Sequence, residues 1–272
     1  MRIMSRIIAV TNQKGGVGKT TTSVNLSASL AATRRRVLLI DLDPQGNATM
    51  GSGVDKNSVR LSGCEVLLDE CPLREATVAA ADAGFYLLPA NSDLTAAEVA
   101  LMGLQQSERC LQQALESVRQ DYDFIFIDCP PSLNMLTINA LVAAQGVIIP
   151  MQCEYYALEG LSALLDTIEK IRSTLNFELR IEGILRTMFD SRNRLANEVS
   201  GQLLGHFGDQ VYNTIVPRNV RLAEAPSHGL PVMRYDRTSQ GARAYLALAG
   251  EILRREEAAL GEAQLAEENN KL

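Results

Sequence analysis

The sequence predicts an α/β fold: one domain built on a doubly wound, mostly parallel β-sheet with helices on both faces. Short apolar, β-branched runs alternate along the chain with segments of helical periodicity, which is typical of right-handed β-α-β units. Several of these runs are apolar on both faces, as strands covered by helices on both sides must be. A length of 272 residues fits a single core of this class.

Seven apolar runs are the expected strands, at 7–11, 37–43, 85–90, 124–128, 146–152, 181–188 and 211–217. Apolar residues at helical spacing predict helices at 20–32, 98–119, 158–175, 196–207 and 239–257. We expect a surface loop at 51–60. No linker or repeat divides the chain, so the prediction is one domain over 1–257, followed by a frayed acidic tail over 258–272.

Composition limits the class of protein. The chain is 46% hydrophobic and 21% charged, which is typical of a globular protein and not of a disordered one. No apolar run reaches the roughly 18 residues of a membrane-spanning helix, and the short apolar N-terminal stretch has no cleavage site. We therefore expect a cytoplasmic protein.

The five cysteines are scattered and form no C-x-x-C pair, so we interpret them as reduced thiols in or near the core. The net charge of −6 disfavours nucleic-acid binding, but the charge is uneven. Between Arg180 and Arg243 there are nine arginines, no lysine and six acids, whereas the segment from Gly250 to Leu272 carries six acids and three bases. The last third of the predicted domain is therefore locally basic.

The strongest motif is a glycine-rich loop between the first predicted strand and the first predicted helix. It resembles a P-loop, although the first glycine of that motif is missing and Lys14 precedes the glycines. Glycines allow positive φ, and backbone N–H groups at a helix N-terminus attract phosphate. We expect Lys19 to meet the β- and γ-phosphates of a nucleotide, Thr20 to ligate Mg²⁺ and Thr21 to bond another phosphate oxygen. The predicted nucleotide-binding residues of the loop are Lys14, Gly15, Gly16, Val17, Gly18, Lys19, Thr20 and Thr21.

Acidic residues end two of the predicted strands. Asp41 and Asp43 end one strand, and Asp128 follows four apolar residues, as in a Walker B motif. Because ligands bind outside the carboxyl ends of parallel strands, these carboxylates should lie near the glycine-rich loop. We expect Asp128 to hold Mg²⁺, directly or through water. Asp41 is interpreted equally well as a structural residue.

Longer segments resemble one family. KGGVGKTTT from Lys14, DLDPQGNAT from Asp41 and IDCPPSLNMLTINAL from Ile127 are similar to the ParA/Soj branch of the deviant Walker A ATPases of the MinD/ParA superfamily. PMQCEYYALEGL from Pro150 and VPRNVRLAEAPSHGLPV from Val216 are more specific to that branch. The resemblance covers about 7–249 and implies a single-domain P-loop NTPase that hydrolyses ATP with Mg²⁺.

The resemblance also implies roles for individual residues. Lys14 matches the family's signature lysine, which crosses the interface of an ATP sandwich dimer to the partner's phosphates. Asp43 matches the residue that orients the attacking water, so Lys14, Lys19 and Asp43 are the expected catalytic residues. Pro217 and Asn219 match positions that line the adenine.

The family's ATP-bound dimer binds DNA without sequence preference, and Arg192 and Arg221 match positions used for this, with Arg218 beside them. Clustered arginines suffice for such binding because the affinity comes from phosphate neutralisation. The implied partners are a second copy of the chain, non-specific DNA and a ParB-type centromere-binding protein that stimulates hydrolysis. The implied location is the nucleoid, and the implied function is chromosome or plasmid segregation.

Three other functions are weighed against this one. A ParA-like ATPase that positions another cargo would share the same chemistry, and the sequence discriminates poorly between the two. A MinD-like membrane-cycling ATPase needs a basic amphipathic C-terminal helix, whereas this C-terminus is acidic. An iron–sulfur carrier needs placed cysteines, and Cys129 after the Walker B motif stands alone. The expectation is therefore a protein without membrane binding.

Overall fold

The computed structural model describes residues 5–269. Its centre is one eight-stranded sheet in the order β3-β4-β2-β5-β1-β6-β7-β8. All neighbouring strands run parallel except β3 and β4, which are antiparallel. The strands are β1 (Arg6–Val10), β2 (Val37–Asp41), β3 (Val78–Ala80), β4 (Phe85–Leu88), β5 (Phe124–Asp128), β6 (Gly146–Gln152), β7 (Arg180–Phe189) and β8 (Val211–Pro217). The predicted doubly wound, mostly parallel sheet is confirmed.

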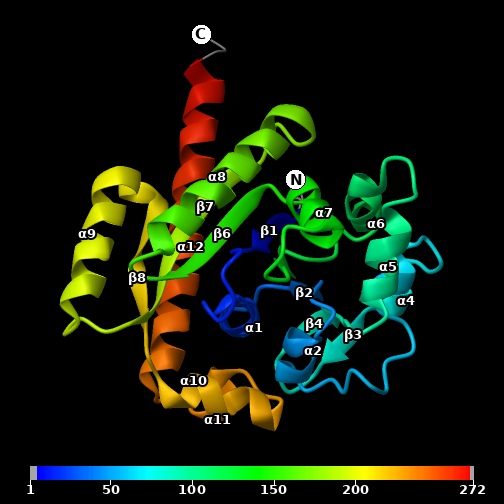
Figure 1. Ribbon diagram of the computed structural model, residues 1–272, viewed down its shortest axis with the longest axis horizontal. Coiled ribbons are helices and arrows are strands. Elements are labelled where there is room, and N and C mark those ends of the chain that lie inside the picture. The colour runs from blue at the N-terminus through cyan, green and yellow to red at the C-terminus, as the bar shows by residue number, and fades with distance from the viewer. Residues whose placement is uncertain (1–4, 270–272) are drawn as a thin grey trace.

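Helices cover both faces of this sheet (Figure 1). One face is packed by α1 (Lys19–Ala32), α2 (Asn47–Gly51), α10 (Val220–Glu224), α11 (Val232–Tyr235) and α12 (Gln240–Asn269). The other is packed by α3 (Gly63–Leu67), α4 (Leu73–Ala76), α5 (Leu94–Leu101), α6 (Cys110–Glu116), α7 (Met135–Ala143), α8 (Ala157–Thr174) and α9 (Arg194–Phe207). Two separate apolar cores result, one on each side of the strands.

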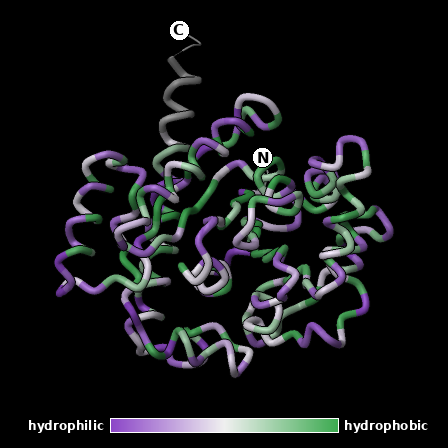
Figure 2. Tube along the Cα trace, viewed as in Figure 1, coloured by the Kyte–Doolittle hydropathy of each residue, from purple (hydrophilic) through white to green (hydrophobic). Residues whose placement is uncertain are grey.

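The alternation of side chains in β1 explains why four consecutive residues of this strand, from Ile7 to Val10, are apolar. Ile7 and Ala9 face the core under α7 and α8, whereas Ile8 and Val10 face the core under α1 and α12. All four are fully buried, and burial of an isoleucine or valine side chain contributes about 1.5–3 kcal/mol. In Figure 2 hydrophobic stretches accordingly lie in the inner strands, and hydrophilic ones are frequent along outer elements such as α9.

Two predicted helices differ from the structure. The pattern over 98–119 is not one helix, because α5 ends at Leu101 and α6 begins at Cys110. Gly103 and Gln106, which has a φ of 56°, interrupt the helical backbone between them. The last helix does not end at Glu257: α12 continues to Asn269, so the backbone expected to fray from Ala258 is helical as far as it is described. Alanine, glutamate and leucine, which dominate this segment, favour helix over coil.

The loops that follow the neighbouring strands β1 and β5 lead to opposite faces of the sheet. The loop after β1 leads to α1 on one face, and the loop after the neighbouring β5 crosses to α7 on the other. Such a divergence opens a crevice at the carboxyl ends of the two strands, where ligands of open α/β sheets bind. Within the described residues, no helix combines the length and apolarity that crossing a membrane requires.

Candidate functional site

The glycine-rich loop lies between β1 and α1, at this crevice. Gly16 and Gly18 have φ values of 73° and 89°, in the left-handed region that glycine adopts without steric cost. Among the described residues, no intramolecular acceptor is found for the backbone amides from Gly15 to Thr21. A run of amides without partners at a helix N-terminus forms a concave, positively polarised cradle for an anion.

Lys19 places a cation beneath this cradle. The residue is 7% exposed, and its ammonium donates to the carbonyl oxygen of Lys14 at 3.2 Å, which closes the loop on itself. Burial lowers the pKa of Lys19, while Asp128 and Asp43 oppose that shift. A desolvated cation of this kind gains a counter-charge when phosphate binds.

Asp128 and Asp41 end neighbouring strands at the same level of the sheet. Both carboxyl groups are fully buried, and burial is the main reason why the pKa of each is raised. Asp41 is satisfied by the Thr49 hydroxyl at 2.7 Å and by the amides of Thr49 and Asp43. The structure thus gives Asp41 a structural role, holding the turn after β2.

Asp128 is less completely bonded. Its Oδ1 accepts a hydrogen bond from Ser23 at 2.7 Å, but its Oδ2 is buried and has no partner among the described residues. The Thr20 hydroxyl lies close enough to lower the pKa of Asp128, against the effect of burial. An orphaned carboxylate oxygen beside a hydroxyl fits a hard divalent cation that keeps several water or phosphate ligands.

These residues fit Mg²⁺ specifically because they supply few protein ligands. Among residues 5–269, no group of three or more His, Cys, Asp and Glu side chains is arranged to hold a metal ion. Magnesium is commonly held by one or two protein oxygens together with substrate phosphates. Thr20 and Asp128 therefore fit a metal that arrives with a nucleotide.

Asp43 lies two residues beyond β2 and is 8% exposed. Its Oδ1 accepts a hydrogen bond from the Gln45 amide at 3.0 Å, which fixes the side chain in the turn. Because the charge of Asp43 acts on both Lys19 and Asp128, the carboxylate lies at the same crevice. The structure therefore brings together the loop, Lys19, Thr20, Asp43 and Asp128.

Lys14 carries an exposed positive charge at the start of the loop. Its ammonium forms an ion pair with Glu154 at 2.5 Å, and both side chains are about half exposed. The Lys14 amide donates to Asn12, whose own side-chain amide donates to the Pro150 carbonyl. The backbone of Lys14 is thus held by β6, while its side chain remains at the surface. Tyr155 and Tyr156, which follow Glu154, are more than two-thirds exposed.

Pro217 is the last residue of β8, and Asn219 lies two residues beyond it. This strand forms the edge of the sheet opposite β3. Pro217 is paired with Phe189 of β7, and Asn219 precedes α10. The Asn219 side-chain oxygen is buried and has no hydrogen-bond partner among the described residues. This orphaned acceptor is suited to the amino group of a base.

The three predicted DNA-contact arginines lie on the surface formed by the β7–α9 connection and α10. Arg192 is 88% exposed at its side chain and pairs with Asp190 through two nitrogens. The charge of Arg218 also acts on Asp190, so these two arginines are neighbours. Arg221 pairs with Glu224 at 2.7 Å and with Asp236 at 3.4 Å. The arginines are accessible, but carboxylates of the same chain already engage two of them.

Sequence reasoning missed several residues that support this site. Ser23 was detectable, because it lies three residues after Thr20 and so on nearly the same face of α1. Asn12, Glu154 and Thr187 gave no such signal, because their partners are far away in the sequence. Thr187, for example, donates to the Val17 carbonyl at 2.7 Å across 170 residues.

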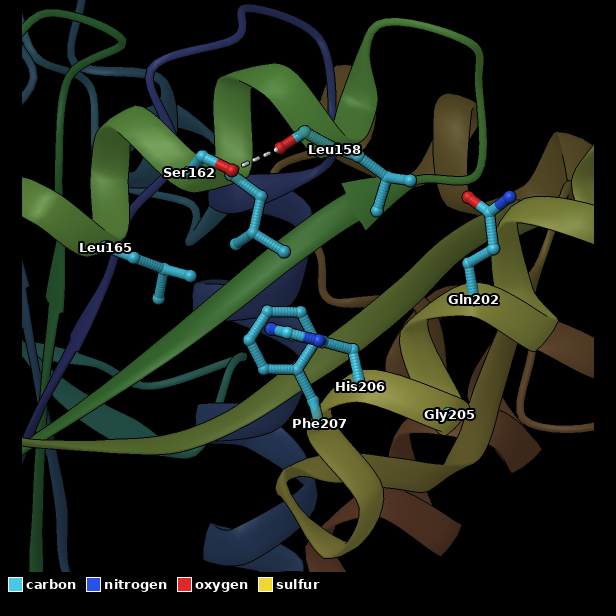
Figure 3. Close-up of a pocket in the computed structure, with 8 residues that line it drawn as sticks. Leu158, Ser162, Leu165, Gln202, Gly205, His206 and Phe207 are labelled. Carbon is cyan, nitrogen blue, oxygen red and sulfur yellow. Dashed lines mark hydrogen bonds between the residues drawn. The ribbon is translucent and has the colours of Figure 1, made fainter.

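A second hollow lies apart from this site. A groove between α8 and α9 has a volume of about 460 Å³. Figure 3 shows residues that line it: Leu158, Ser162, Leu165, Gln202, Gly205, His206 and Phe207. None of its lining residues belongs to the predicted nucleotide or DNA sites. Its composition is largely apolar, so it offers no catalytic constellation.

Comparisons with known proteins agree with this geometry. A family model described as "AAA domain" matches residues 5–181. The chain is 52% identical over 249 residues to the sporulation initiation inhibitor protein Soj of Bacillus subtilis, covering 92% of this chain and 98% of the relative. It is 50% identical over 253 residues to the chromosome partitioning protein ParA of Myxococcus xanthus, covering 93% and 89%.

The fold is also similar to a solved structure described as cobyrinic acid a,c-diamide synthase from Mycobacterium smegmatis with bound ADP and magnesium. The TM-score is 0.83 at 39% identity, over 94% of this chain and 97% of the other. The similarity extends over almost the whole length of each chain.

Proposed function

This chain belongs to the ParA/Soj family of partition ATPases, and we propose that it is a nucleotide-dependent switch that dimerises around MgATP, binds DNA and releases it on hydrolysis. The activity is ATP hydrolysis, ATP + H₂O to ADP + phosphate. The finer features of the proposal are the sandwich dimer, the DNA surface and stimulation by a ParB-type partner. Each rests on particular residues.

ATP and magnesium fit the crevice at the carboxyl ends of β1 and β5. The backbone amides from Gly15 to Thr21 would hold the phosphates, and Lys19 would neutralise the β- and γ-phosphates. Thr20 and Asp128 would hold Mg²⁺, which offsets charge on the phosphate oxygens when bound. Pro217 and the orphaned oxygen of Asn219 would receive the adenine.

Hydrolysis needs a water held in line with the γ-phosphate and little covalent help from the protein. We assign the orientation of that water to Asp43, whose carboxylate is fixed by the Gln45 amide. Lys19 stabilises charge that develops on the transferring group, and it is suited to this because it is already desolvated.

Dimerisation is supported by the position of Lys14. Its side chain is at the surface and turned to Glu154 rather than to its own loop. In a face-to-face dimer this lysine would leave Glu154 and reach the phosphates bound to the other copy. Each bound triphosphate would then contact two lysines, Lys19 of its own chain and Lys14 of the other copy. ATP would therefore stabilise the dimer more than ADP does.

DNA binding is assigned to Arg192, Arg218 and Arg221. Their exposure and clustering suit contacts with the phosphate backbone, and a dimer would double the number of such contacts. Attraction between these arginines and DNA can exceed the repulsion expected from the net charge of −6, because association depends on the charge of the surface that faces the DNA. Nucleoid association and cargo segregation, stimulated by a ParB-type protein, follow from the same cycle.

The observation that carries the proposal is the run of amides from Gly15 to Thr21 that have no acceptor within residues 5–269, beside the exposed Lys14. It is tested by measuring DNA binding with ATP, ADP and no nucleotide, for the wild type and Lys19→Ala. We expect salt-sensitive binding with ATP only, abolished by Lys19→Ala.

Lys170→Ala is the matched control, because it removes the same charge from an exposed position on α8. It should bind DNA as the wild type does. Equal DNA affinity of the wild type in all three nucleotide states would contradict the proposed switch.

A further inference from the structure

Thr187, near the end of β7, forms a direct link to the phosphate loop. Its hydroxyl donates a hydrogen bond of 2.7 Å to the carbonyl oxygen of Val17, and both residues are buried. Thr187 is also the only described residue whose atoms a Cβ on Gly18 would meet within 4 Å. The side chain of Thr187 therefore packs directly against Val17 and Gly18 of the loop.

The hydrogen bond from Thr187 to Val17 also orients the Gly18 N–H, which is one of the proposed phosphate donors. The carbonyl of Val17 and the amide N–H of Gly18 belong to the same planar peptide unit and point in opposite directions. A hydrogen bond that fixes this carbonyl therefore fixes the direction of the Gly18 N–H. Gly18 has a left-handed backbone, with a φ of 89°, and its N–H has no acceptor among the described residues.

On its other side, Thr187 adjoins a distorted piece of backbone. Met188 has a φ of 48°, which is uncommon for a residue other than glycine. The pairing of β7 with β8 is irregular here, with register shifts before and after Arg186. Residues held in sparsely populated conformations often belong to segments that change shape.

This distorted segment lies close to two of the proposed DNA contacts, Arg192 and Arg218. Asp190, two residues beyond Met188, holds Arg192. Phe189 is paired with Pro217, and Arg218 follows directly. A small displacement at the end of β7 therefore reaches both arginines through the backbone.

We propose that Thr187 is a positioning residue that couples the occupied phosphate loop to the placement of Arg192 and Arg218. The inference rests on the proposed ATP-dependent DNA binding. The Thr187 hydroxyl already holds the Val17–Gly18 peptide, and phosphate bound by the Gly18 amide would restrain the same peptide from its other side. The hydrogen bond would carry this added restraint to the end of β7. A ligand can shift such a segment only through contacts that differ between its two states, and we assign that part to this hydrogen bond.

The test compares Thr187→Val with Thr187→Ser at saturating MgATP. Valine keeps the β-branched shape but lacks the hydroxyl, whereas serine keeps the hydroxyl. DNA affinity is measured with ATP and without nucleotide, and ATP affinity is measured separately by calorimetry. We expect Thr187→Val to reduce the ATP-dependent increase in DNA affinity about fivefold, in line with the removal of one hydrogen bond, with nucleotide-free binding unchanged. Thr187→Ser should retain the increase.

Two results would overturn the inference: a full increase in Thr187→Val, or an equal reduction in both variants. Circular dichroism shows whether each variant is folded. Thr187→Ser carries the test if valine is not tolerated, since a folded serine variant without the increase also contradicts coupling through the hydroxyl. A wild type without ATP-dependent DNA binding is a different outcome. It contradicts the proposed function, and the inference falls with it.

Discussion

The phosphate loop and the arginine surface are both anion sites, but they are built in opposite ways. The loop offers backbone amides from Gly15 to Thr21 that have no acceptor among the described residues, so it is ready for phosphate. On the arginine surface, Arg192 and Arg221 already pair with carboxylates of the same chain. The nucleotide site is thus preorganised, whereas a DNA phosphate must compete with Asp190, Glu224 and Asp236.

This difference predicts tight nucleotide binding and weak, salt-sensitive DNA binding. A preorganised site spends little free energy in arranging its donors. Exposed ion pairs on flexible side chains contribute little free energy and are screened by salt. DNA phosphates can therefore displace the carboxylates from the arginines, but this displacement lowers the affinity of the protein for DNA. Four variants with matched controls test this contrast, from the largest expected effect to the smallest.

The largest effect is expected for Asp43→Ala. The loop that binds phosphate is left intact, so ATP binding and dimerisation should persist, while turnover falls by about 100-fold or more because the water is no longer oriented. Steady-state phosphate release and calorimetry with ATP measure the two properties. Asp82→Ala, at an exposed turn, is the control and should behave as the wild type. Normal turnover by Asp43→Ala would remove this residue from catalysis.

A backbone test distinguishes preorganisation from simple charge. Gly16 has a φ of 73°, whereas Gly15 does not have a positive φ, and a Cβ at either position meets no atom within 4 Å. Gly16→Ala should weaken ATP binding about tenfold, since a left-handed backbone costs an alanine roughly 1–2 kcal/mol. Gly15→Ala lacks this cost and should be nearly neutral. Equal affinity of the two variants would show that loop conformation is not what the nucleotide selects.

On the arginine surface, the salt dependence of DNA binding provides the test. Arg192→Ala should weaken binding in the presence of ATP and reduce the slope of log affinity against log salt by about 0.9 for each DNA phosphate that is no longer neutralised. Arg194 is the matched control, because it is equally exposed and also pairs with its own carboxylate, Glu198. An unchanged slope for Arg192→Ala, or the same change for Arg194→Ala, would assign the DNA surface elsewhere.

The smallest effect is an increase in affinity. Asp190→Asn releases Arg192 from its ion pair and should strengthen DNA binding about two- to threefold at low salt. Glu198→Gln releases Arg194 with the same change of charge and should have less effect. If both raise the affinity equally, net charge rather than the release of Arg192 explains the increase.

The pH dependence of the Asp190 pair follows from its titration. Hydrogen bonding from Arg192 lowers the pKa of Asp190 to about 2, so the carboxylate stays charged well below neutral pH. A depressed pKa means that the pair is present above the ordinary pKa of aspartate and is disrupted only as the pH falls through the folded value. Mild acidification should therefore not mimic Asp190→Asn, which a titration of DNA affinity in buffers of constant ionic strength would check.

The parallel sheet was predictable because its strands carry a purely local signal. Ile7–Val10 and Phe124–Ile127 are each four consecutive apolar residues, and this pattern is typical of strands with both faces covered. The short antiparallel β3 and the break between α5 and α6 were not predictable in the same way. Val78–Ala80 is a strand only because β4 lies beside it, and the leucines on both sides of the break continue a helical period that Gly103 and Gln106 interrupt.

The sequence by itself determined the phosphate loop, its helix and the acidic strand ends, because each is a contiguous motif whose chemistry depends on neighbouring residues. Tertiary structure alone decided that Thr49 satisfies Asp41 while one oxygen of Asp128 is left without a partner among the described residues. It also decided that Glu154 holds Lys14, that Thr187 supports Val17 and that acids cover the arginines. The physical reason is that the decisive contacts join segments separated by up to 170 residues, and only the packed sheet fixes their distance.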